Sequence, residues 1–135
     1  MPHLIVEYSA NLEDRIDREG LLDRLHAVAL ETGLFPIGGV RIRAYRAEHY
    51  RIADCAPDNA FVHVTAMVGS GRSLEKRKAA SELIFVALCE ALEELQATSP
   101  LAISFNMQEF DPVLNFKKNN LHEFVEKRGG LPPPK

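Results

Sequence analysis

Apolar and polar positions follow the same order twice along the chain, and each time they predict a strand, a helix and a second strand. In the first half, residues 3–8 form a short apolar run that is typical of a strand. Residues 21–29 then carry apolar side chains at helical spacing. Residues 40–50 alternate between apolar and polar positions, which predicts a second strand with Arg41 and Arg43 on the same face.

The second half repeats this order with stronger signals. Residues 60–68 are apolar on both faces, which is typical of a central strand covered on both sides. Residues 74–96 have helical spacing and predict one long helix, for which Ser73 is a suitable N-cap. Residues 101–110 alternate cleanly and predict the last strand.

This repetition indicates an α+β fold built from two β-α-β units, at about residues 2–50 and 60–110. A helix that crosses between two strands makes those strands parallel. We therefore expect one four-stranded mixed sheet with two helices on one face. A small domain usually covers the other face of such a sheet by association.

The chain beyond the second unit carries weaker patterns. Residues 112–118 are expected to form a turn or a short hairpin, and residues 120–127 have helix-like character. Glycines and prolines dominate residues 128–135, which we expect to be a disordered tail. The whole chain is thus expected to be a single domain over residues 1–127 with a short tail.

Composition narrows the class of protein. The net charge of −3, from 16 Lys and Arg against 19 Asp and Glu, argues against a nucleic-acid-binding protein. No apolar run approaches the ~20 residues that span a bilayer, and no signal-peptide pattern opens the chain, so we expect a cytoplasmic protein without a membrane partner. Cys55 and Cys89 are too few for a disulfide framework, which fits a reducing cytoplasm. Neither has a second Cys or a His at metal-ligand spacing, so we expect no metal site.

Pro2 follows Met1 and leads directly into the first predicted strand. A small residue at the second position normally lets the initiator methionine be removed, which would leave a free secondary amine on Pro2. An unperturbed α-amine titrates near pH ~8, so an amine held in the fold is a candidate base. The alternative is that Pro2 only begins an edge strand, where its missing N–H costs nothing.

The turn at residues 69–73, Gly-Ser-Gly-Arg-Ser, links a predicted strand to the long helix. Backbone N–H groups at the start of a helix favour an anion, and Arg72 would add a guanidinium that can bind a carboxylate with two hydrogen bonds. The turn lacks the ending of a phosphate loop and the third glycine of a dinucleotide fingerprint. The alternative is a tight turn with a solvated arginine. Arg41 and Arg43 are likewise either a solvated strand face or a site for an acidic ligand.

Other candidate chemistry has little support in the sequence. No carboxylate pair, Ser–His–Asp set or metal cluster stands out, which argues against ordinary hydrolase chemistry. His63 lies among apolar residues and is expected to be a hydrogen-bonded core histidine rather than a catalyst. Cys89 lies in a helical apolar context and is expected to be a small core residue rather than a nucleophile.

Several segments of the chain carry a family resemblance when they are taken together and in order. They are Pro-His-Leu-Ile-Val-Glu-Tyr-Ser at 2–9, Gly-Leu-Phe-Pro-Ile-Gly-Gly-Val-Arg at 33–41, Ala-Phe-Val-His-Val-Thr at 60–65, Gly-Arg-Ser at 71–73 and Leu-Asn-Phe-Lys-Lys-Asn-Asn at 114–120. From Pro2 to about Glu126 the sequence resembles the 5-carboxymethyl-2-hydroxymuconate delta-isomerases, a family of the tautomerase superfamily. The proline and strand at the start are shared across that superfamily, whereas the Gly-Leu-Phe-Pro, Gly-Arg-Ser-Leu-Glu and Leu-Asn-Phe-Lys segments are more specific.

The resemblance implies a homotrimer and a reaction without cofactor or metal. The implied reaction converts 5-carboxymethyl-2-hydroxymuconate, a polycarboxylate, to 5-oxopent-3-ene-1,2,5-tricarboxylate in the breakdown of homoprotocatechuate formed from 4-hydroxyphenylacetate. Pro2 is implied to be the general base and then the acid that returns the proton. Arg41 and Arg72 match positions that are implied to bind substrate carboxylates and to stabilise charge on the dienolate oxygen. Arg43 and Ser73 lie beside them and are further candidates.

Some interpretations stay open at this point. Phe116 either closes an apolar wall of the site across a subunit boundary or packs within the trimer, and we favour packing. Another tautomerase-superfamily enzyme, such as a phenylpyruvate-type tautomerase, a hydratase or a dehalogenase, is one alternative, although several arginines favour a polyacid over an aromatic keto acid. A non-catalytic trimeric anion-binding module is the other. The catalytic role of Pro2 depends on removal of Met1, because an amide nitrogen cannot act as a base.

Overall fold

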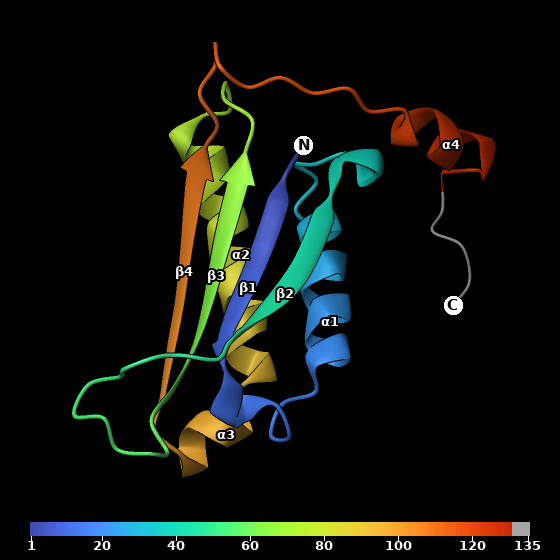
Figure 1. The fold of residues 1–135 in the computed structure, drawn as a ribbon. Helices are drawn as coiled ribbons and strands as arrows, with labels where there is room; N and C mark the ends of the chain where they lie inside the picture. Colours follow the sequence, from blue (N-terminus) through green and yellow to red (C-terminus); the bar gives the residue numbers. More distant parts are fainter. Residues whose placement is uncertain (131–135) are drawn as a thin grey trace.

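The computed structural model describes residues 1–130 and contains the predicted strand–helix–strand order twice (Figure 1). The first unit comprises β1 (His3–Ser9), the 3₁₀ helix η1 (Ala10–Leu12), α1 (Arg18–Glu31), the 3₁₀ helix η2 (Ile37–Gly39) and β2 (Arg41–Ala47). The second unit and the helix that follows it comprise β3 (Ala60–Val68), α2 (Leu74–Ala91), α3 (Glu93–Thr98), β4 (Leu101–Glu109) and α4 (Leu121–Lys127).

The strands form one four-stranded mixed sheet in the order β2-β1-β3-β4, which confirms the predicted fold class. β1 pairs in parallel with β2, β3 pairs in parallel with β4, and β1 joins β3 in antiparallel register. The helices α1 and α2 lie side by side on one face of this sheet, as predicted (Figure 1). Alternate strand residues point toward the helices and form the core with them. Fully buried members of this core are Leu4, Val6, Leu25, Val62, Val64, Ile84 and Leu88.

The start of the long predicted helix is confirmed, but its end is not. The Ser73 side chain caps α2 by accepting a hydrogen bond from the Lys76 backbone N–H at 3.2 Å. The prediction of one helix over residues 74–96 is wrong, because Leu92 leaves helical geometry at φ −109° and ψ 8° and separates α2 from α3. The Leu92 N–H bonds to the Cys89 carbonyl at 3.2 Å, and this tighter last turn ends α2 while the Leu92 side chain stays buried.

The second face of the sheet is open in the single chain. Phe61, Thr65 and Met67 on this face of β3 are half-buried, and none of the helices within residues 1–130 covers them. The expectation of a central strand covered on both sides is therefore not met by this chain alone. His63 lies on the same open face rather than in the core, and its predicted hydrogen bond is made by Nδ1, 2.6 Å from Ser104 Oγ.

After β4 the chain crosses to the other side of the molecule and ends its described part in α4, which packs against η2 (Figure 1). The Asp111 carboxylate accepts hydrogen bonds from the Val113 and Leu114 N–H groups, both at 2.8 Å, and so forms the predicted turn. No strand pairs across residues 112–118, so the hairpin alternative is wrong. The predicted helix near residues 120–127 is α4. Of the expected tail, residues 131–135 lie outside the described residues.

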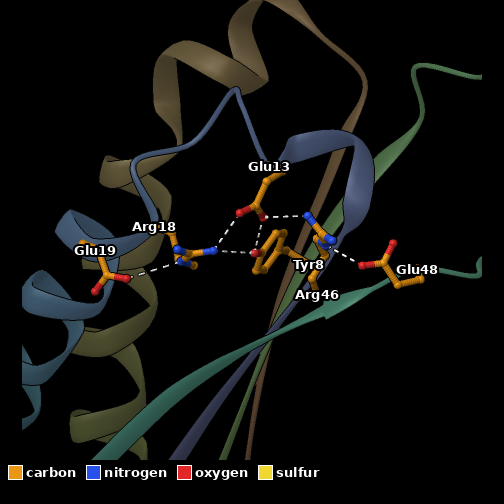
Figure 2. A network of polar contacts seen from close by, with 6 residues as sticks. All are labelled: Tyr8, Glu13, Arg18, Glu19, Arg46 and Glu48. Carbon is orange, nitrogen blue, oxygen red and sulfur yellow. Dashed lines mark hydrogen bonds and ion pairs between the residues drawn. The ribbon is translucent and has the colours of Figure 1, made fainter.

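Charged side chains around Tyr8 form a network at the C-terminal end of β1 (Figure 2). Pro2 lies before the other end of that strand. The buried Tyr8 donates its hydroxyl proton to the Glu13 carboxylate, and Arg18 Nη1 donates to the same carboxylate at 2.7 Å. Arg46 Nη1 lies 3.8 Å from it, and Arg46 Nε pairs with Glu48 at 2.5 Å. Each arginine in this network faces a carboxylate, which is the ordinary structural use of the residue.

Three further expectations concern membranes, metals and cysteines. Within residues 1–130, no helix is long and apolar enough to cross a membrane. The same part of the chain holds no group of three or more His, Cys, Asp or Glu residues that could bind a metal ion. Cys55 is exposed, whereas Cys89 is partly buried, and burial raises the pKa of the Cys89 thiol. A raised thiol pKa argues against a nucleophilic role, as the sequence indicated.

Candidate active site

Pro2 is fixed in the fold at the entrance to β1. Its side chain is almost fully buried, and its carbonyl accepts a hydrogen bond from the Arg41 N–H at 3.1 Å. Gly39 of η2 lies directly against it, since a Cβ atom on Gly39 would stand 3.4 Å from Pro2 Cδ. The alternative that Pro2 only begins an edge strand is wrong, because β1 lies between β2 and β3 in the sheet. η2 and the first residue of β2 hold Pro2 on two sides.

The amine at the start of the chain lies among positive charges. Partial burial, together with the nearby charges of Lys117, Arg72 and Arg41, lowers the pKa of the Met1 α-amino group below its ordinary value. All of these effects disfavour the ammonium form. Removal of Met1 would put the secondary amine of Pro2 at the terminus, next to the same cations.

Arg41 is the first residue of β2 and pairs with His3 of β1 in the parallel register. Its guanidinium Nη1 donates to the Gly39 carbonyl at 2.7 Å, which folds the side chain back toward η2 and Pro2. This partner is a neutral carbonyl, so the arginine is oriented while its charge stays available to an anion.

Arg72 brings the turn of the second unit to the same place. Its guanidinium donates from Nη1 to the Gly69 carbonyl and from Nη2 to the Leu34 carbonyl, both at 3.2 Å. It also stacks over the Phe35 ring, 5.2 Å from the ring centroid. Gly71 has a φ of +106°, a conformation that favours glycine and lets the chain turn tightly before Arg72. The charges of Arg72 and Arg41 both lower the pKa of the terminal amine, so the two arginines affect the same group, and their shared site stays a prediction.

The cations near the N-terminus share one feature, which is that none of them has a carboxylate partner in the described part of the chain. Within residues 1–130, no ion pair joins Arg41, Arg43, Arg72 or Lys117 to a carboxylate. Several arginines away from the terminus do pair with carboxylates, at 2.7 Å in Arg18–Glu13, 3.0 Å in Arg24–Glu90 and 3.6 Å in Arg77–Glu109. Others do not, since Arg15 bonds to the Ser99 hydroxyl and Arg51 to the Tyr50 carbonyl. In a chain whose net charge is −3, these cations without anionic partners give the region around the terminus a local positive charge.

The weaker candidates from the sequence have different places. Arg43 lies on the open face beside His3, with its Nη1 3.1 Å from His3 Nδ1, and its Nε donates to the Tyr45 hydroxyl at 3.2 Å. Burial and the charges of Arg43, Arg41 and the terminal amine lower the pKa of His3, so that its ring stays neutral and can accept this hydrogen bond. Ser73 is exposed and serves as the N-cap of α2. Phe116 is 86% exposed, and this chain does not bring it into the site.

Comparison with known proteins identifies the family. The family model for 5-carboxymethyl-2-hydroxymuconate isomerase matches residues 2–125. The chain is 40% identical over 122 residues to the 5-carboxymethyl-2-hydroxymuconate Delta-isomerase of Escherichia coli, covering 90% of this chain and 97% of that relative. The chain belongs to the 5-carboxymethyl-2-hydroxymuconate isomerase family. It is therefore an enzyme, an isomerase of the tautomerase superfamily.

Solved structures agree with the family assignment. A crystal structure of a 5-carboxymethyl-2-hydroxymuconate isomerase from Deinococcus radiodurans R1 superposes with a TM-score of 0.86 and 37% identity, covering 92% of this chain and 93% of that one. A fused 4-OT described as a symmetric trimer has a TM-score of 0.62 and 14% identity, covering 86% of this chain and 93% of that one, and so shares the fold alone.

Two residues near the terminal amine, Lys117 and His3, were not identified as candidates from the sequence. Lys117 acts on the terminal amine from the segment after β4, and His3 accepts from Arg43. Lys117 lay within the family-specific Leu-Asn-Phe-Lys segment, which was the available signal. His3 had no such signal, because its partner is 40 positions away in the chain.

Proposed function

We propose that this protein isomerises 5-carboxymethyl-2-hydroxymuconate to 5-oxopent-3-ene-1,2,5-tricarboxylate, with the secondary amine of Pro2 as base and then acid. The observation that carries the proposal is the group of cations without carboxylate partners around Pro2 and the chain terminus. A tricarboxylate is the kind of ligand that such a group attracts. The name of the Escherichia coli relative gives the same substrate.

The chemistry asked of Pro2 is one proton transfer in each direction. The neutral amine takes the proton of the enol hydroxyl, and the resulting dienolate becomes a ketone as its electrons move along the conjugated chain. The prolyl ammonium then gives the proton to the carbon that bears the carboxymethyl group. The amine must be neutral to begin this cycle, and the burial and positive charge that lower the pKa of the terminal amine favour that form.

Arg41 and Arg72 have two tasks in this proposal. Each guanidinium can bind a substrate carboxylate, and one of them lies opposite the oxygen on which negative charge builds. Their carbonyl partners at 2.7 and 3.2 Å hold them in position before the substrate arrives. A preorganised donor of this kind is typically worth ~10²–10³-fold in rate. Arg43 adds positive charge on the same face, whereas the capping bond of Ser73 supports a structural role for that residue.

The proposed assembly is a homotrimer. One face of the sheet is open in the single chain, and Val113, Leu114 and Phe116 after β4 are 76%, 72% and 86% exposed. Exposed apolar groups of this kind are usually covered by a partner. The related fold described as a symmetric trimer supports this number of subunits. In this assembly Phe116 packs against a neighbouring chain. Sedimentation equilibrium measures the oligomer directly.

The experiment that tests the function follows the ultraviolet absorbance of 5-carboxymethyl-2-hydroxymuconate. It uses protein whose loss of Met1 is verified by mass, beside Pro2→Ala and beside a form with an uncleavable N-terminal extension. We expect rapid loss of the dienol signal with the processed protein. The extended form has an amide at Pro2 and should lose ~10²–10⁴-fold, the range for a general base. Pro2→Ala keeps a primary amine in a different geometry and should fall between the two.

The controls separate substrate from mechanism. Absence of turnover by the processed protein would reject the substrate, and phenylenolpyruvate in the same assay would test the phenylpyruvate-type alternative. Equal rates for the processed and the extended protein would keep an isomerase but reject Pro2 as its base.

A further inference from the structure

Residues 111–119 link β4 to α4 and cross the end of the sheet at which β1 begins (Figure 1). Hydrogen bonds hold this segment at both of its ends. At one end Phe110 donates its N–H to the Val68 carbonyl at 2.8 Å, and its ring meets the His3 ring edge-on with centroids 5.8 Å apart. At the other end Asn119 Nδ2 donates to the Gly38 carbonyl at 3.0 Å. We call residues 111–119 the strap. Its anchors lie one residue from Pro2 on β1 and one residue from Gly39 on η2.

Lys117 lies on the strap between these anchors, two residues before Asn119, which bonds to η2. Its positive charge is one of those that lower the pKa of the terminal amine. The side chain is exposed, and no ion pair ties it to a carboxylate within residues 1–130. It is thus a cation whose charge affects the terminal amine and is not neutralised by a carboxylate within residues 1–130.

We propose that Lys117 binds the carboxylate of the carboxymethyl arm, as a third cation beside Arg41 and Arg72. This inference rests on the proposed function, because it assigns that arm of the substrate to a residue. Arg41 of the first unit and Arg72 of the second match the two terminal carboxylates of a linear muconate. Arg43 of the first unit bonds to His3 and Tyr45 instead. The strap lies outside both units, and it contributes one further cation for the one further carboxylate that the branched substrate carries. Lys117 is therefore a specificity-determining residue.

The test compares Lys117→Met, which keeps the length of the side chain and removes its charge, with Lys118→Met as a matched control on the next residue. Lys118 is also exposed and has no assigned role. The substrates are 5-carboxymethyl-2-hydroxymuconate and 2-hydroxymuconate, which lacks the carboxymethyl arm. Both are assayed at a pH at which the amine is neutral in every variant, so that only carboxylate binding differs.

We expect Lys117→Met to lose about 10- to 100-fold in kcat/KM on the branched substrate, mainly through KM, which is the range for a lost hydrogen bond to a charged group. On 2-hydroxymuconate the same variant should stay within about twofold of wild type, whereas Lys117→Arg should restore most of the activity on the branched substrate. Equal losses on the two substrates, or equal behaviour of Lys117→Met and Lys118→Met, would overturn the proposal.

Calorimetric binding of propane-1,2,3-tricarboxylate and of succinate keeps this test separate from the proposed function. If wild-type protein turned over neither muconate, the proposed function would fail. A wild-type preference for the tricarboxylate that disappears in Lys117→Met would still support the third cation, and its persistence in that variant would reject it.

Discussion

Replacing Gly38 by alanine tests how the strap is held over the site. A Cβ atom at this position would lie 2.5 Å from His122 Nδ1 and 3.0 Å from the His122 Cα, distances at which something must move. Inserting a methyl group into a packed position typically costs about 1–3 kcal/mol. The three atoms nearest to such a Cβ all belong to His122, whereas a Cβ on Gly39 would lie 3.4 Å from Pro2 Cδ, so the first effect of Gly38→Ala falls on α4.

The cheaper response is displacement of α4 from η2. None of its residues is buried, so little apolar contact is lost when the helix moves away. A cost of about 1–3 kcal/mol shifts the docking equilibrium by about 5- to 150-fold toward the displaced form. Displacement breaks the Asn119–Gly38 hydrogen bond and withdraws Lys117 from the terminus.

The measurements are amide hydrogen exchange across α4 and the strap, the melting temperature, and kcat/KM on the branched substrate. We expect faster exchange in α4, a nearly unchanged melting temperature, and a loss of activity similar to that of Lys117→Met. His122→Ala serves as the control. Combined with Gly38→Ala it removes the side-chain contact at 2.5 Å but leaves the backbone contact at 3.0 Å, so the double variant should recover only part of the activity. A protected α4 with full activity, or a fall in melting temperature without faster exchange in α4, would refute this account of the docking.

Two more predictions concern residues outside the chemistry. Ser73→Ala removes the cap of α2 and should lower the free energy of unfolding by about 1 kcal/mol in urea denaturation, with kcat/KM unchanged. Ser70→Ala is the control and should change neither quantity. A large loss of activity at full stability would instead assign Ser73 to substrate binding. The Tyr8 hydrogen bond, and then the charges of Arg18 and Arg46, lower the pKa of Glu13 below its value in the unfolded chain. The ionised carboxylate therefore stabilises the fold above the unfolded pKa, and this contribution is lost as pH falls through the lower folded pKa. Denaturation midpoints measured against pH should fall more steeply for wild type than for Glu13→Gln, and parallel curves would contradict this assignment.

The strands and the face of the sheet that each side chain occupies could be predicted from the sequence, because strand periodicity is local. The alternation over residues 40–50 put Arg41 and Arg43 on one face, where the register with β1 has them. The break at Leu92 could not be predicted, because residues 74–96 keep helical spacing on both sides of it. The open second face of the sheet was predictable from the two expected helices on the other face, but an apolar run such as β3 does not say what covers it.

The residue types of the candidate site could be predicted from the sequence, but the hydrogen-bond and ion-pair partners of its side chains could not. Arg18 and Arg72 both stand at or beside the start of a helix, and that position alone does not say what each side chain binds. Arg18 faces Glu13, whereas Arg72 donates to the Leu34 carbonyl 38 positions away. Lys117 was missed for the same reason, because its approach to the terminus depends on both anchors of the strap.

The cations without carboxylate partners explain how one amine can serve as base and then as acid in the proposed reaction. In the free protein, burial and then the positive charge of these cations lower the pKa of the terminal amine, which keeps it neutral and able to accept a proton. Binding of a substrate with three carboxylates neutralises that charge, and by linkage it raises the affinity of the amine for the proton. The amine then holds the proton during the lifetime of the dienolate and gives it up to carbon. After release of the product the cations lower the pKa again, so the charge that attracts the substrate also resets the base.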